Sequence, residues 1–159
     1  MLEVRRYSKA DHAEVLRIHV LAMETAGAYK GPGPWDEDLE RIEETYLDGS
    51  GEFLIGRLEG RLVAMGAFKK SDPGSAEIKR MRVHPESQGR GFGRRILEEL
   101  ERRARSLGYR RLHLETSVVQ IAAQGLYRGA GFLEAGREMI DGWECLLFEK
   151  RLDPAERPA

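Results

Sequence analysis

Apolar residues recur along the N-terminal part of the chain at two spacings, which predict a strand followed by a helix. Residues Leu2–Tyr7 alternate between apolar and polar side chains, as in a half-buried strand. Apolar residues then recur every three or four positions to about Glu24, which predicts a helix that Ser8 or Asp11 can cap. The loop Gly27–Pro34 is rich in glycine and proline and ends this pattern.

A second helix is expected directly after this loop. Trp35 and the acidic run Asp36-Glu37-Asp38 begin it. Its buried face consists of apolar residues at helical spacing: Leu39, Ile42 and Tyr46. Acidic residues in a first helical turn suit the positive end of the helix dipole, and the alternative is that they face a cationic ligand.

The rest of the chain alternates between strands and helices. Tight turns are predicted at Glu59-Gly60 and at Asp72-Pro73-Gly74. The predicted elements are strands Phe53–Leu58, Arg61–Lys69 and Ala76–Val83, a helix from about Gly91 to Leu107, strand Arg111–Thr116, a helix around Ala123–Tyr127, and a final hairpin of Phe132–Met139 and Trp143–Leu152. The complete order is β-α-α-β-β-β-α-β-α-β-β.

This order predicts a mixed sheet. A helix crosses over between strands Ala76–Val83 and Arg111–Thr116, so these two strands are parallel if they share a sheet, whereas the hairpins make antiparallel pairs. The predicted fold class is therefore α/β (α+β), with about seven strands and with helices on both faces. The length of 159 residues predicts one domain over residues 1–152 and a flexible tail over residues 153–159.

The composition narrows the class of protein. An apolar fraction of 41% and a charged fraction of 33% are typical of a soluble globular domain. The net charge of −1 does not favour nucleic-acid binding. Cys145 is the single cysteine, which excludes an internal disulfide and a multi-cysteine metal site. The chain has neither a signal-peptide pattern nor an apolar run of about 18 residues, so we expect a cytoplasmic protein without a membrane span.

The segment Val83–Arg95 joins a predicted strand to the following helix and carries three glycines, Gly89, Gly91 and Gly93. Glycines lack β-carbons, so a bound group can approach the backbone closely. The unpaired N–H groups and the dipole at the start of a helix favour an anion such as phosphate. Three arginines add positive charge: Arg90, Arg94 and Arg95. The alternative is a glycine-rich turn with solvated arginines.

Two common nucleotide-binding patterns do not fit this segment. The dinucleotide pattern G-x-G-x-x-G fails, because the sixth position is Arg94 when counted from Gly89 and Ile96 when counted from Gly91. The mononucleotide loop needs Gly-Lys followed by Ser or Thr, and the chain has no such run. Enzymes that use nucleoside triphosphates are therefore disfavoured.

The spacing Gln88-x-x-Gly91-x-Gly93 resembles the pyrophosphate loop of the GNAT acyltransferases, which hold acyl-coenzyme A (acyl-CoA). Two further segments are similar to that family in order and spacing: Glu77-Ile78-Lys79-Arg80-Met81 before Val83-His84-Pro85, and Gln120-x-x-Ala123-x-x-Leu126-Tyr127-x-x-x-Gly131-Phe132. The resemblance covers nearly the whole chain. Gln120 departs from it, since the family often carries asparagine there. The family's sheet is splayed near the glycine loop, and we expect the same here.

The resemblance implies that acetyl-CoA is the co-substrate and that no metal takes part. Free backbone groups at Met81, Arg82 and Val83 would pair with the pantetheine arm. Backbone N–H groups of one segment would hold the pyrophosphate: Gln88, Gly89, Arg90, Gly91, Phe92, Gly93 and Arg94. The remaining predicted cofactor contacts are Gln120 and Tyr127.

Transfer of an acyl group from a thioester to a primary amine requires one group that takes a proton from the amine and one that protonates the thiolate. Tyr127 matches a tyrosine of the family, and a phenol with a pKa near ~10 can donate to a thiolate whose thiol has a pKa near ~8.5. Glu77 is the first candidate for the base and Glu115 the second, with water as a further alternative. The chain offers no evident covalent nucleophile, which favours direct transfer in a ternary complex.

The acceptor in this family usually lies near the loop after the first helix and the last hairpin. The corresponding segments here, residues 26–38 and 139–143, predict a pocket with aromatic walls and an acidic lip: Tyr29, Trp35, Asp36 and Trp143. We expect a small cationic amine or a peptide amine in preference to an acidic substrate. The last hairpin could also pair across a homodimer. The alternative function is a catalytically idle acyl-CoA-binding regulatory module.

Overall fold

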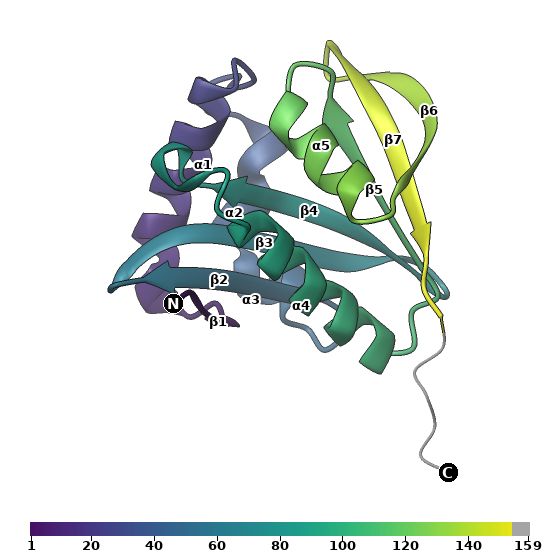
Figure 1. The fold of residues 1–159 in the computed structure, drawn as a ribbon, viewed down its shortest axis with the longest axis horizontal. Helices are drawn as coiled ribbons and strands as arrows, with labels where there is room; N and C mark the ends of the chain where they lie inside the picture. Colours follow the sequence, from purple (N-terminus) through teal and green to yellow (C-terminus); the bar gives the residue numbers. More distant parts are fainter. Residues whose placement is uncertain (154–159) are drawn as a thin grey trace.

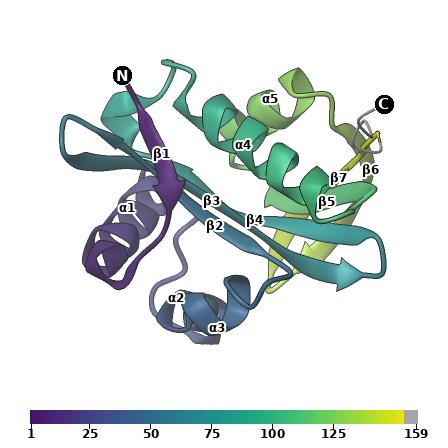
Figure 2. The ribbon, with the colours of Figure 1, turned by 90° about the horizontal axis from the view of Figure 1, so that it is seen from below.

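The computed structural model describes residues 1–153, which form one mixed sheet with helices on both faces (Figures 1 and 2). The strands are β1 (Glu3–Arg6), β2 (Glu52–Leu58), β3 (Arg61–Asp72), β4 (Ser75–Val83), β5 (Arg111–Ser117), β6 (Leu133–Ile140) and β7 (Trp143–Arg151). The helices are α1 (His12–Thr25), α2 (Glu37–Glu40), α3 (Ile42–Tyr46), α4 (Phe92–Ser106) and α5 (Ile121–Gly129), with short 3-10 turns η1 (Lys9–Asp11), η2 (Pro34–Asp36) and η3 (Pro85–Ser87). The strand order is β1-β2-β3-β4-β5-β7-β6, which confirms the predicted fold class.

Two predictions about the organisation of the chain stay predictions. The single domain over residues 1–152 is one of them. The other is the flexible tail, whose residues 154–159 lie outside the described part. Among residues 1–153, no helix is both long and apolar enough to cross a lipid bilayer.

The two faces of the sheet are covered by different helices. Figure 2 shows α1, α2 and α3 on one face and α4 and α5 on the other. Strand β3 explains how both faces are filled, because successive side chains of a strand point to opposite faces. Met65 and Ala67 pack with α1 and α3, whereas Ala64 and Phe68 pack with α4. The apolar run in β3 is therefore continuous because both faces of this strand are buried.

The sheet splits between β4 and β5, as predicted. These parallel strands pair only where residues 75–77 meet residues 111–113, and they diverge beyond that point. The ladder between β3 and β4 is also interrupted, and Arg80 at the interruption has a φ of 59°, in the left-handed region. Gly66 of β3 makes room there, because a β-carbon on it would lie 2.3 Å from the sulfur of Met81. The split opens toward the glycine loop.

The prediction of one continuous second helix is wrong. Pro34–Asp36 forms a 3-10 turn, α2 begins only at Glu37, and the chain breaks at Arg41 before α3. Leu39 is buried in α2, while the Asp38 carboxylate accepts hydrogen bonds from the Tyr46 hydroxyl and from Arg80, the latter at 2.8 Å. Arg80 and Asp38 are 42 positions apart, so the local spacing of apolar residues could not predict this contact.

Asp11 does not cap α1 with its side chain, contrary to one of the two predictions for that helix. Its carboxylate is fully buried and instead accepts hydrogen bonds from Arg5 at 2.8 Å and from Arg57 at 2.7 Å. It also accepts from the backbone N–H of Ser8, at 2.9 Å. These partners hold the pKa of Asp11 well below its usual value, with the Arg5 hydrogen bond as the largest cause.

Candidate active site

Two hollows meet at the split in the sheet. The first, which we call the glycine-loop groove, has a volume of about 440 Å³ and lies between the end of β4, the glycine loop and the start of α5. The second, which we call the aromatic pocket, has a volume of about 470 Å³ and lies between α1, η2, β4, β5 and the β6–β7 turn. Four residues line both hollows: Met23, Met81, Arg82 and Gln120.

The glycine-loop groove contains the start of helix α4. Gly91 directly precedes α4, and its φ of 83° is one that only glycine adopts without strain. Gly89 has a φ of 77°, and for both glycines no atom lies within 4 Å of a β-carbon built on the backbone. The first N–H groups of α4 have no partner within the helix, so they are available to an anion in the groove.

The arginines of the loop are engaged elsewhere. Arg94 lines the groove, but its guanidinium donates to Glu98 at 3.1 Å and to the carbonyl oxygen of Gly129 at 2.9 Å. The Arg90 guanidinium lies 4.8 Å from the centre of the Phe92 ring, and Arg90 lines neither hollow. Arg90 is the one predicted cofactor residue that the structure does not bring to the site. The predicted anion site therefore relies mainly on backbone groups.

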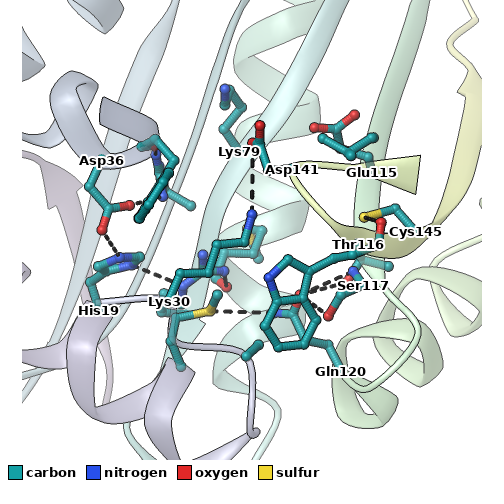
Figure 3. Close-up of a pocket in the computed structure, with 18 of the residues that line it drawn as sticks. His19, Lys30, Asp36, Lys79, Glu115, Thr116, Ser117, Gln120, Asp141 and Cys145 are labelled. Atoms are coloured by element: carbon teal, nitrogen blue, oxygen red, sulfur yellow. Dashed lines mark hydrogen bonds and ion pairs between the residues drawn. The ribbon is translucent and has the colours of Figure 1, made fainter. Parts of the chain in front are cut away.

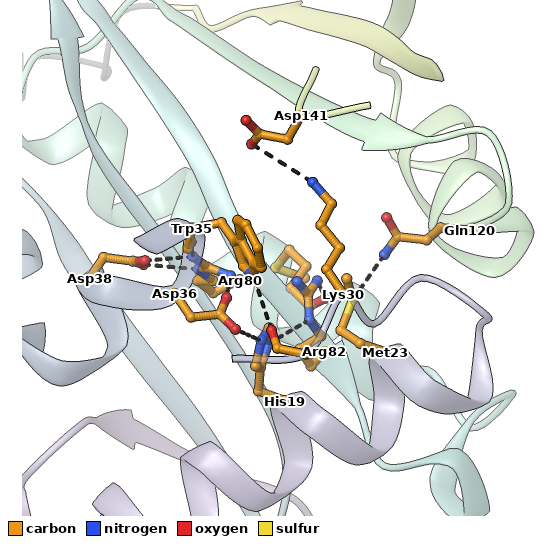
Figure 4. Close-up of polar contacts among 12 residues, drawn as sticks. His19, Met23, Lys30, Trp35, Asp36, Asp38, Arg80, Arg82, Gln120 and Asp141 are labelled. Atoms are coloured by element: carbon orange, nitrogen blue, oxygen red, sulfur yellow. Dashed lines mark hydrogen bonds and ion pairs between the residues drawn. The ribbon is translucent and has the colours of Figure 1, made fainter. Parts of the chain in front are cut away.

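Gln120 lies on the border between the two hollows. Its side-chain oxygen accepts hydrogen bonds from Thr116 and Ser117, at 3.1 to 3.3 Å, which closes the turn between β5 and α5. Its amide nitrogen points to the sulfur of Met23 on α1, 3.7 Å away (Figure 4). Gln120 thus links the two helices that flank the split.

The aromatic pocket contains all four residues predicted to bind the acceptor: Tyr29, Trp35, Asp36 and Trp143. It also contains Lys30, which the sequence did not single out (Figure 3). Lys30 lies in the loop between α1 and η2, before both tryptophans in the chain. The pattern around it gave no signal, because a lone lysine in a glycine-rich loop is normally solvated.

The predicted acidic lip is neutralised by the protein itself. Arg80 donates to Asp36 at 3.0 Å and to Asp38 at 2.8 Å, and its side chain is only 10% exposed (Figure 4). His19 also contacts Asp36, through Nε2 at 3.1 Å. Asp36 therefore lines the pocket, but its carboxylate is already paired.

His19 links this ion-pair cluster to Arg82. Arg82 donates to Nδ1 of His19 at 3.3 Å, so Nε2 carries the proton and donates to Asp36. Burial and the charge of Arg82 lower the pKa of His19 to about 4, which keeps the ring neutral at pH 7. His19 is thus a buried, hydrogen-bonded residue.

Tyr127 extends from α5 to the pocket. Its side chain is 5% exposed and packs edge-on against Phe132, with ring centres 5.8 Å apart. Burial raises the pKa of the Tyr127 phenol to about 12, and the charge of Arg82 partly offsets this rise. The hydroxyl is therefore protonated at neutral pH and is a hydrogen-bond donor.

Two carboxylates lie on the two sides of the split. Glu77 comes from β4 and Glu115 from β5, and both line the aromatic pocket. Partial burial and the negative charge of Glu77 raise the pKa of Glu115, which makes it the stronger base when it is ionised. The Glu115 carboxylate is labelled in Figure 3.

A splayed mixed sheet with a glycine loop at its open end defines the class of acyl-CoA N-acyltransferase folds. Residues 13–132 match the model of the acetyltransferase (GNAT) family, which is more than half of the chain. The chain belongs to this family.

Individual relatives support this assignment. The chain is 42% identical to an IAA acetyltransferase from Azospirillum brasilense over 85 residues, which are 53% of this chain and 56% of that protein. It is 35% identical to a mycothiol acetyltransferase from Mycobacterium marinum over 155 residues, which are 82% of this chain and 47% of that protein. The chain thus spans about half the length of these curated relatives.

Solved structures share the fold. A GNAT acetyltransferase from Staphylococcus aureus superposes with a TM-score of 0.88 at 19% identity and covers 96% of this chain and 100% of its own. A protein from Salmonella typhimurium, solved with its cofactor acetyl-CoA, has a TM-score of 0.79 at 21% identity and covers 100% of this chain and 98% of its own. At these identities the likeness concerns the fold.

Proposed function

We propose that this chain is an N-acetyltransferase that moves an acetyl group from acetyl-CoA directly to a primary amine in a ternary complex. The amine nitrogen attacks the thioester carbonyl carbon and forms a C–N bond. The C–S bond breaks, and the sulfur leaves as a thiolate that takes up a proton. The proton lost from the amine passes to a carboxylate or to water.

The position of Tyr127 carries this proposal. Its protonated phenol lines the aromatic pocket beside Arg82, one of the residues shared with the glycine-loop groove. A coenzyme whose pyrophosphate sits at the start of α4 and whose arm follows residues 81–83 would bring its sulfur to this junction. Tyr127 would then face the leaving sulfur.

The raised pKa changes the role expected for Tyr127. A phenol with a pKa of about 12 does not fully transfer its proton to a thiolate whose thiol has a pKa near ~8.5. It stabilises the thiolate by a hydrogen bond instead, and Arg82 adds positive charge at the same place. Proton acceptance from the amine falls to Glu77, our first candidate, or to Glu115 beside it.

The test is release of free coenzyme A from acetyl-CoA in the presence of a panel of amines. Tyr127→Phe is expected to lower kcat by about 100-fold or more while coenzyme A binding is unchanged. Tyr109→Phe is a matched control, because its hydroxyl is bonded to the Ser50 carbonyl oxygen, outside both hollows. Tight coenzyme binding without turnover of any amine would instead support the idle regulatory module.

The homodimer predicted through the last hairpin remains part of this proposal. Strand β6 is at the edge of the sheet, and Leu133 and Met139 on it are 73% and 70% exposed. Light scattering of the purified chain would test it. A monomeric mass at high protein concentration would refute the dimer without affecting the proposed chemistry.

A further inference from the structure

Lys30 occupies the aromatic pocket with its own ammonium group. Its Nζ lies 5.5 Å from the centre of the Trp35 ring, 6.0 Å from the centre of the Trp143 ring and 3.7 Å from a carboxylate oxygen of Asp141 (Figures 3 and 4). The side chain is 22% exposed, although lysine normally extends its ammonium into water. Trp35 at η2 and the β6–β7 turn, with Asp141 and Trp143, therefore converge on one cation.

The chemistry of these contacts is that of an ammonium-binding site. Tryptophan gives the most favourable ring for a cation, and both rings lie within the distance at which this attraction operates. Asp141 supplies the negative charge. Asp36 cannot supply this charge in the same way, because its carboxylate is already paired with Arg80.

We infer that this cage of Trp35, Trp143 and Asp141 recognises an alkylammonium group of the acceptor, and that Lys30 occupies the cage in its place when no acceptor is bound. The inference rests on the proposed function and names its substrate class: an unbranched aliphatic chain with a reacting amine at one end and an ammonium at the other. Two ammonium groups repel each other, so the acceptor must displace Lys30 to enter the cage.

The neutral, reacting amine is then left at the other end of the chain, in the part of the pocket that Glu77, Glu115 and Tyr127 line. The cage therefore provides recognition, while the residues at the split provide the chemistry. A monoamine is protonated at neutral pH, so its single ammonium can enter the cage but leaves no amine at the split to react. The structure thus assigns the preference for a diamine to a defined set of three side chains.

A direct binding measurement can test this inference without turnover. The two tryptophans of the chain are both in the cage, so intrinsic tryptophan fluorescence reports on it specifically. A linear diamine and an uncharged linear diol of equal length would be titrated into the full chain. The wild type is expected to bind the diamine more tightly.

Lys30→Met keeps the length of the side chain but removes its charge. It is expected to tighten diamine binding by about tenfold and to leave the weak binding of the diol unchanged. Lys30→Arg keeps the charge and should behave as the wild type does. Asp141→Asn should weaken diamine binding by about tenfold, and Lys9→Met, at an exposed position remote from the pocket, serves as the control.

Diamine affinity that is the same in the wild type, Lys30→Met and Asp141→Asn would overturn the inference. Equal affinity for the diamine and the diol would also overturn it. The proposed acetyl transfer is judged separately, by release of coenzyme A with the diamine as acceptor. Diamine binding that responds to Lys30 without any release would support the cage and refute the transferase activity.

Discussion

Replacing Gly91 with alanine separates backbone strain from anion binding. The φ of 83° at Gly91 lies in the left-handed region, where an L-residue costs about 1–2 kcal/mol. No protein atom lies within 4 Å of the added β-carbon, so the methyl group meets no steric clash in the empty groove. We therefore expect the free energy of unfolding to fall by about 1–2 kcal/mol, with the fold retained.

The loss in coenzyme binding free energy should be larger than the loss in folding stability. Gly91 lines the groove where the pyrophosphate is expected, and a methyl group there keeps the anion away from the first N–H groups of α4. A hydrogen bond to a charged group contributes about 1.5–3 kcal/mol. Loss of one such bond corresponds to a Kd for coenzyme A that is about 10- to 160-fold weaker.

Gly108→Ala is the matched control. Gly108 follows α4 at its other end, has a φ of 89°, and likewise has no atom within 4 Å of an added β-carbon. Urea unfolding should show similar destabilisation of both variants, and calorimetric titration with coenzyme A should show weaker binding only for Gly91→Ala. Wild-type affinity in both variants would refute the anion site, and equal weakening in both would mean that strain alone is responsible.

Three further predictions follow from the charged residues. Glu77→Gln removes a negative charge beside Glu115, so the pKa of Glu115 should fall. If Glu115 is the base, the acidic limb of the pH–rate profile should then move to lower pH. A limb that stays in place would exclude Glu115 as the titrating base. Arg80→Met leaves the carboxylates of Asp36 and Asp38 without their cation. The free energy of unfolding measured in urea should fall by about 3 kcal/mol. A fall of less than about 1 kcal/mol would show that these ion pairs do not stabilise the fold. Folding lowers the pKa of Asp11, so its ion pairs stabilise the protein above about pH 3.9 and this contribution is lost as the pH falls further. Unfolding measured between pH 7 and 3 should show this loss in the wild type, and an identical slope in Asp11→Asn would contradict it.

The order of strands and helices could be predicted from the sequence because local patterns encode it. Alternation and helical spacing located the elements, and the spacing of Gly89, Gly91 and Gly93 located the groove. The residues predicted for the acceptor also share one cavity, because the loop after α1 and the β6–β7 turn meet across the split. Their roles in binding and catalysis stay predictions.

Long-range pairing explains what the sequence did not reveal. Arg80, at a bulge within β4, reaches Asp38, and the chain between α2 and α3 is interrupted at Arg41. The insertion of Lys30 between two tryptophans depends in the same way on segments far apart in the chain. The engagement of Arg94 is different, because its partner Glu98 is four residues away and the spacing alone predicts this pair.

The four residues that line both hollows have a consequence for how two ligands bind. A coenzyme that moves Gln120 or Met23 reshapes the wall against which the amine packs, since these side chains touch each other across the border. In that case the two proposed binding events are thermodynamically linked. Whatever factor the coenzyme applies to the affinity for the amine, the amine must apply the same factor to the affinity for the coenzyme.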